Sequence, residues 1–64
     1  MNTIGQKITA LREGQCMTKT ELANKLDVSQ PFLTMVECGR KNPPIWMLAR
    51  LSEIFGVTVD EIIK

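Results

Sequence analysis

Apolar residues recur three or four positions apart along the chain, as they do on one face of a helix. The first such sets are Ile4, Ile8 and Leu11, and then Leu22, Ala23 and Leu26. No segment alternates apolar and polar positions over a useful length, as a half-buried strand would. The pattern therefore predicts an all-α fold.

Capping sequences and turn residues divide this pattern into five short helices. TKTE at 18–21 and TVDE at 58–61 are capping boxes, and Ser29 is a good N-cap that is followed by a proline in the first turn. We expect the first helix over about residues 3–13 and the fourth over about residues 45–55. The four helix ends are expected at Gly14, Asp27, Gly39 and Gly56.

The predicted third helix, SQPFLTMVECG, has two distinct sides. At about 100° per residue, Ser29, Leu33 and Val36 share a face that turns to the core. An outward face carries four uncharged residues: Gln30, Pro31, Thr34 and Met35. Glutamine can bind adenine through two hydrogen bonds, and apolar side chains can contact the thymine methyl. The outward face could thus read DNA, although scattered exposed apolar residues are also ordinary on a small protein.

Composition narrows the classes of function. The 64 residues suffice for one small domain, and they contain no histidine or tyrosine. Ser29 and Ser52 have no plausible base partner, so we expect no enzyme and no cofactor. Cys16 and Cys38 are too few and too far apart in sequence for a disulfide framework or a metal site, and we expect free thiols.

The net charge is +1, but it is unevenly distributed. Up to Arg50 the chain has seven basic and four acidic residues, and after it one basic and three acidic residues. A polyanionic partner should therefore meet the first part. The chain lacks a run of apolar residues long enough for a membrane span and a signal-peptide pattern, so we expect a cytoplasmic protein with no membrane partner.

The segment TKTELANKLDVSQPFLTMVECGRKNP resembles the helix-turn-helix of Cro- and lambda-repressor-type proteins, the XRE-like family. The similarity continues through LSEIFGVTVDEII and covers almost the whole chain. It implies one compact five-helix DNA-binding domain over residues 1–64, with the helix-turn-helix at about 18–38 and the third helix as recognition helix. Asp27 stands in place of the usual glycine of the turn, and Pro44 where Ser or Thr commonly caps the fourth helix.

The resemblance assigns roles by position. Base edges would be read by Gln30, Pro31, Thr34 and Met35. The DNA backbone would be contacted by Thr18, Lys19, Asn24, Phe32, Arg40, Lys41 and Asn42, with Thr18 and Lys19 helped by the N-terminus of the second helix. A structural ion pair between Arg12 and Glu37 would join the first helix to the end of the third.

The predicted fourth helix is also two-sided. We expect its core side to carry Ile45, Leu48, Ser52 and Phe55. We expect the opposite stripe, extended by the fifth helix, to form a dimer interface of Trp46, Met47, Arg50, Ile54, Val59 and Ile63. Trp, Met and Arg are enriched at interface centres, and related domains pair through this region.

The leading interpretation is a sequence-specific DNA-binding transcriptional regulator, most simply a small dimeric repressor or Cro-like switch protein. Its partners would be double-stranded operator DNA and a second copy of the chain, with no small-molecule ligand. One alternative is a protein-binding module that docks an antitoxin- or antirepressor-type partner on the outer face of the third helix; another is a structural accessory domain. The salt dependence of the binding affinity distinguishes DNA binding from apolar docking, because phosphate contacts weaken steeply as the salt concentration rises.

Overall fold

The computed structural model describes residues 4–64, and in this part of the chain all the regular structure is helical. The helices are α1 (Ile4–Gly14), α2 (Lys19–Leu26), α3 (Gln30–Glu37), α4 (Ile45–Phe55) and α5 (Val59–Ile63). The all-α prediction is confirmed, and the helices begin and end close to the predicted positions. The predicted start of the first helix, at residue 3, lies outside the described residues.

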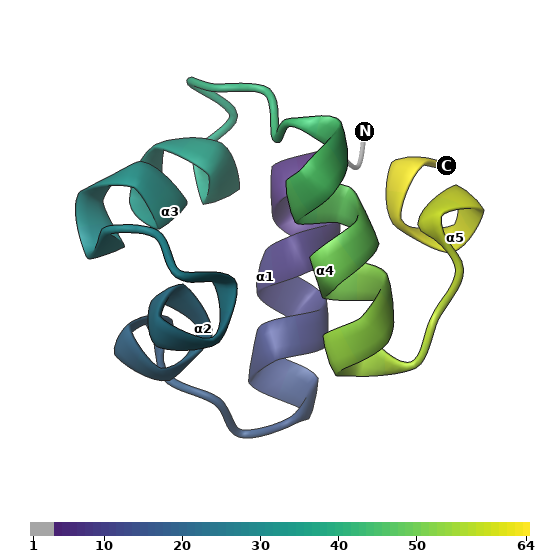
Figure 1. Cartoon of the computed structure of the whole chain (residues 1–64), viewed down its shortest axis with the longest axis horizontal. Coiled ribbons are helices and arrows are strands. Elements are labelled where there is room, and N and C mark those ends of the chain that lie inside the picture. Colours follow the sequence, from purple (N-terminus) through teal and green to yellow (C-terminus); the bar gives the residue numbers. More distant parts are fainter. Residues whose placement is uncertain (1–3) are drawn as a thin grey trace.

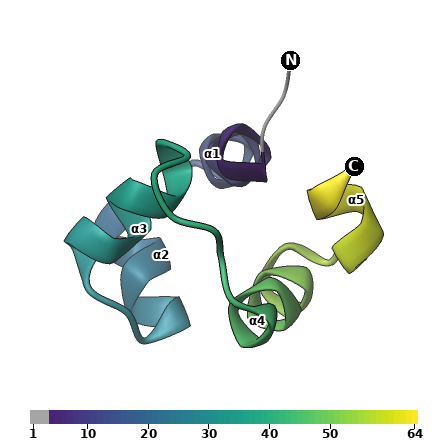
Figure 2. The same cartoon turned by 90° about the horizontal axis from the view of Figure 1, so that it is seen from above.

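The helices surround one core. Figure 1 shows α2 and α3 on one side of the molecule and α5 on the other. Seen from above, α1 and α4 lie on opposite sides and are joined across one end by α2 and α3 (Figure 2). All five helices contribute buried apolar side chains to the core: Ile8, Leu22, Ala23, Leu26, Leu33, Val36, Met47, Leu51, Phe55 and Ile62.

Side-chain caps explain where the helices begin. The Thr18 hydroxyl accepts from the Glu21 N–H at 3.1 Å, and the Glu21 carboxylate accepts from the Thr18 N–H at 3.0 Å, which completes the predicted capping box. The Ser29 hydroxyl accepts from the Phe32 N–H at 3.2 Å and caps α3. At α5 the Thr58 hydroxyl accepts from the N–H three residues later, at 3.1 Å. Each cap satisfies a backbone donor that the helix itself leaves without a partner.

Left-handed residues end two of the helices. Asp27, with φ 60°, caps α2, and Gly56, with φ 66°, caps α4. Asp tolerates this conformation better than most residues, although less well than glycine. The departure from the family's glycine at Asp27 therefore leaves the turn intact. The helix α4 follows Pro44, which supplies no side-chain cap.

The predicted facing of α4 is wrong at two positions. Met47 was expected in the outward dimer stripe, but its side chain is buried, with 0% of its surface exposed. Ile45 was expected on the core side, but 84% of its surface is exposed. The core side of α4 is instead formed by Met47, Leu51 and Phe55, which recur every four residues.

The physical reason is that α4 has apolar residues on nearly every side, so periodicity alone does not select its buried face. Leu48 and Ser52, also predicted on the core side, are half-buried at its border. The Ser52 hydroxyl donates to the Val57 carbonyl and holds the turn between α4 and α5. The helix α4 packs against α2 and α5, and Met47, rather than Ile45, enters the core that they share.

Candidate nucleic-acid interface

A short turn holds α3 against α2. Within it, the Val28 N–H donates to the Ala23 carbonyl at 3.0 Å. Leu22 and Leu26 of α2 and Leu33 of α3 are completely buried against one another and the rest of the core. The two helices thus form the helix-turn-helix, and its geometry is fixed by packing on the inner side.

The outer side of α3 is an open, shallow surface. Gln30, Pro31, Thr34 and Met35 line a shallow, open depression of about 400 Å³. Gln30 and Pro31 are exposed, whereas Thr34 and Met35 are half-buried. The structure therefore brings the four predicted base-reading residues together on one face, and Leu33 and Val36 lie on the buried face as expected. Ser29, also expected on that face, is exposed and acts as the cap.

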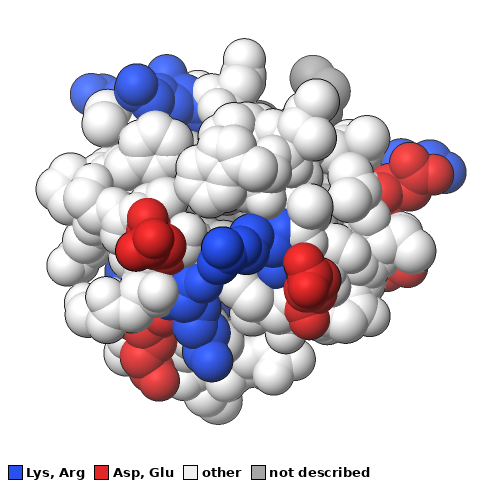
Figure 3. Space-filling model, in the orientation of Figure 1, with Lys and Arg blue, Asp and Glu red and all other residues white. Residues whose placement is uncertain are grey.

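The connection after α3 carries basic side chains beside this surface. The Met35 carbonyl accepts from the N–H groups of Arg40, at 2.9 Å, and Lys41, at 3.3 Å, so the chain folds back over the end of α3. The Lys41 ammonium lies 5.6 Å from the centre of the Phe32 ring, within range of a cation–π contact. Figure 3 shows a group of basic side chains at the edge of the molecule where this connection lies. Arg40, Lys41 and Asn42 are all exposed there.

The start of α2 flanks the surface on the other side. Thr18 and Asn24 are exposed and Lys19 is half-buried. The Thr18 N–H donates to the Glu21 carboxylate at 3.0 Å. Donation first from this N–H and then from the Thr18 hydroxyl lowers the pKa of the Glu21 carboxyl from its ordinary value. The Thr18 N–H is therefore occupied within the capping box of α2.

The predicted ion pair forms between α1 and the end of α3. Arg12 Nε lies 2.9 Å from Glu37 Oε2, and Arg12 Nη2 lies 3.4 Å from Glu37 Oε1. Their side chains are only 10% and 4% exposed, respectively. The remaining Arg12 terminal nitrogen donates to the Met17 carbonyl at 3.0 Å. Arg12 thus ties the end of α3 to α1 and to the segment before α2.

The same junction depends on close backbone contact. A Cβ atom placed at Gly5 would lie 2.4 Å from the Val36 carbonyl oxygen and 2.6 Å from that of Glu37. These distances are far below van der Waals contact, so α1 reaches the end of α3 only because residue 5 lacks a side chain. Glycine and the ion pair together fix the position of α3.

One contact at the surface was not predicted from the sequence. The Thr20 hydroxyl lies 3.4 Å from Gln30 Oε1, within hydrogen-bond distance. Thr20 is on α2 and Gln30 on α3, so no spacing within a single helix indicates the pair. Only the crossing of the two helices brings them together.

Only some residues of the predicted dimer stripe are exposed at the surface. Trp46, Val59 and Ile63 are 49%, 36% and 46% exposed, whereas Ile54 is half-buried against the core. Arg50 is exposed and donates to the Lys25 carbonyl at 3.5 Å, in the last turn of α2. The start of α4 and the end of α5 lie at the same end of the molecule (Figure 1). The exposed large apolar residues of these two helices, which we call the α4–α5 patch, are Ile45 and Trp46 at the start of α4 and Val59 and Ile63 at the two ends of α5.

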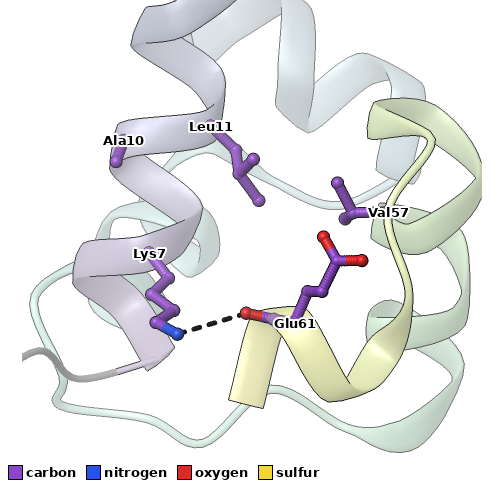
Figure 4. Close-up of a pocket in the computed structure, with 5 residues that line it drawn as sticks. All are labelled: Lys7, Ala10, Leu11, Val57 and Glu61. Carbon is purple, nitrogen blue, oxygen red and sulfur yellow. Dashed lines mark hydrogen bonds between the residues drawn. The ribbon is translucent and has the colours of Figure 1, made fainter. Parts of the chain in front are cut away.

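A separate cleft lies between α1 and α5 (Figure 4). It encloses about 260 Å³ and is lined by Lys7, Ala10, Leu11, Val57 and Glu61. The Lys7 ammonium donates to the Glu61 backbone carbonyl at 3.2 Å and bridges the two helices (Figure 4). None of the predicted DNA-contacting residues lines this cleft.

Residues 4–64 hold no cluster of three or more His, Cys, Asp or Glu side chains suited to a metal ion. In the same range, no helix combines the length and the apolar character that crossing a membrane requires. Cys16 and Cys38 are exposed free thiols.

Comparison with known proteins supports the same reading of the fold. A helix-turn-helix family model matches residues 8–62. The immunity repressor protein of Bacillus phage phi105 is 33% identical over 61 residues, which are 95% of this chain and 42% of that protein. The HTH-type transcriptional activator BcrR of Enterococcus faecalis is 34% identical over 59 residues, which are 92% of this chain and 29% of that protein. The chain thus spans less than half the length of these two relatives.

A solved structure agrees with the family match. SinR, described as the master regulator for biofilm formation and solved in complex with DNA, superimposes with a TM-score of 0.85 and 31% sequence identity. The alignment covers 94% of this chain and 97% of that one. The chain therefore belongs to the XRE-like helix-turn-helix family, the Cro and lambda-repressor type.

Proposed function

We propose that this chain is a sequence-specific DNA-binding transcriptional regulator, most simply a small dimeric repressor or Cro-like switch protein of the cytoplasm. The observation that carries the proposal is the uncharged outer surface of α3, which lies beside the basic α3–α4 connection. A surface of this kind suits the major groove, with base edges against α3 and phosphates against its flanks. Regulation would follow from occupation of operator DNA and would require no catalysis.

Specificity would come from α3. Gln30 would bind an adenine through its amide, and Pro31, Thr34 and Met35 would form a shallow apolar surface for thymine methyl groups. The position of α3 supports this role, because the Arg12–Glu37 pair and the close approach at Gly5 hold the helix in a fixed orientation. A rigid recognition helix keeps its side chains in register with the bases.

Replacing Gln30 with alanine should relax specificity at one base pair and leave affinity for random DNA nearly unchanged. The expected loss of discrimination is about 1–3 kcal/mol, the usual value of a bidentate base contact. Duplexes selected from a random pool by the unaltered protein would be tested with each base pair substituted in turn. Gln15→Ala, at an exposed glutamine outside the surface, is the matched control. A loss that is equal for all sequences would contradict base reading by Gln30.

Affinity would come largely from phosphate contacts on both flanks. Lys19→Ala and Arg40→Ala should each weaken binding to selected and random duplexes alike, because phosphates carry no sequence information. Each should also reduce the slope of log affinity against log salt by about one unit. Fluorescence anisotropy over a range of salt concentrations measures both effects. Salt-independent binding of a protein partner, with unchanged slopes on DNA, would instead favour the alternative of a protein-docking module.

We further propose a two-fold dimer that forms through the α4–α5 patch. The support for it is that Ile45 and Trp46 at the start of α4, and Val59 and Ile63 of α5, are large apolar residues left exposed in the single chain. Ile45 takes the place in this proposal that the sequence had assigned to Met47. A two-fold arrangement would place two α3 helices about 34 Å apart, one turn of DNA, and would favour a near-palindromic operator.

A further inference from the structure

We propose that Thr20 is a positioning residue that holds the Gln30 side chain ready for base reading. The inference rests on the proposed function and adds a residue of α2 to those that determine specificity. The observation behind it is the contact between the Thr20 hydroxyl and Gln30 Oε1, at 3.4 Å. Both residues are exposed, so the contact forms at the edge of the surface that would meet DNA.

The backbones on which the two side chains sit are fixed. Gln30 is the first residue of α3, between the cap residue Ser29, whose hydroxyl accepts from the Phe32 N–H, and Pro31. The proline ring locks its own φ and restricts the residue before it. Thr20 lies in the first turn of α2, whose capping box is complete. Burial of the leucines between α2 and α3 then sets the distance between Thr20 and Gln30.

The contact restricts a side chain that would otherwise be mobile. Glutamine has three side-chain torsions and loses much of its rotamer freedom when it binds a base. Threonine is stiff at χ1 because it is β-branched, so its hydroxyl is a well-placed partner. An amide that is held before DNA arrives loses less freedom on binding, and this preorganisation favours the correct base.

The contact is compatible with binding to adenine. The Gln30 carbonyl oxygen has two lone pairs, and one of them can accept from the Thr20 hydroxyl. The other lone pair remains for the adenine N6 amino group, while the amide nitrogen donates to adenine N7. Thr20 therefore needs no contact with DNA to affect which base Gln30 prefers.

The experiment compares Thr20→Val, which removes the hydroxyl and keeps the side-chain shape, with Thr20→Ser, which keeps the hydroxyl. Duplexes selected from a random pool by the unaltered protein provide the probe, together with the same duplexes substituted at the base pair that depends on Gln30. Thr20→Val should reduce discrimination at that base pair about two- to tenfold, the range expected for one hydrogen bond. Affinity of this variant for random DNA should not change, and Thr20→Ser should keep the discrimination of the parent.

A second measurement separates positioning from a direct role. In a Gln30→Ala background, Thr20→Val should have no further effect on discrimination, since the side chain that it positions is gone. An equal effect in both backgrounds, or a uniform loss on random DNA, would overturn the inference. So would unchanged discrimination in Thr20→Val while Gln30→Ala relaxes it, and in that case the proposed function would stand. If Gln30→Ala itself has no effect on discrimination, Gln30 does not read a base, and the inference about Thr20 is then wrong as well.

Discussion

Replacing Glu37 with alanine should lower the free energy of unfolding by about 3 kcal/mol, because the substitution leaves the nearly buried Arg12 guanidinium without its carboxylate. The Arg12 side chain is 10% exposed, and its one other hydrogen bond goes to the Met17 carbonyl. That loss is a large share of the total stability of a small domain, which is typically about 5–15 kcal/mol. Urea denaturation followed by circular dichroism measures it.

Two controls distinguish the ion pair from general effects of substitution. Glu53→Ala removes an exposed carboxylate from α4 and should change stability by less than about 0.5 kcal/mol. The double variant Arg12→Met, Glu37→Leu should recover much of the loss, since replacing both charges by apolar groups leaves none unpaired. A Glu37→Ala protein that unfolds with the parent midpoint would show that the pair contributes nothing to the fold.

Replacing Trp46 with alanine should convert a proposed dimer into a folded monomer and reduce operator affinity by at least about 100-fold, because binding would lose its second, linked half-site. Half of the Trp46 surface is exposed in the single chain, which leaves the ring available to a second copy. Large aromatic residues are frequent hot spots of interfaces. Sedimentation velocity measures the oligomeric state, and anisotropy on a two-half-site duplex measures the affinity.

The parent protein offers an independent test of the same interface. The sequence contains one tryptophan, so its fluorescence reports on position 46 alone. Dilution through the dissociation range should shift the emission to the red as water reaches the ring. Ile45→Ala should weaken the dimer in the same direction, whereas Gln15→Ala, outside the patch, should not. A Trp46→Ala protein that remains dimeric at micromolar concentration would place the interface elsewhere.

Local sequence signals were sufficient for the helices. The capping box of Thr18 and Glu21, the Ser29 cap and the left-handed Asp27 involve residues within a few positions of one another. Interactions of this range depend little on the rest of the fold, so they can be recognised in the sequence. Spacing also predicted the buried Leu33 and Val36 of α3, three positions apart, although Ser29, expected on the same face, is exposed.

The buried face of α4 could not be predicted in this way. Apolar residues surround that helix, and the periodic pattern fits both a core side through Ile45 and one through Met47. The distinction is energetic rather than local, since it depends on which side chain fills the space left by the other helices. The structure selects Met47, with no exposed surface, and leaves Ile45 outside.

The sequence by itself determined five helices, three of them with a Ser or Thr cap, and an uncharged outer face on the third, while its resemblance to a known family supplied the pairing of Arg12 with Glu37. The tertiary structure alone decided how α4 faces the core, how closely α1 meets α3 at Gly5, and that Thr20 reaches Gln30. The physical reason is how far apart in the sequence the interacting residues lie. The side-chain caps join residues three positions apart, within one helix turn. Thr20 and Gln30 are separated by 10 positions and come together only because α2 and α3 cross.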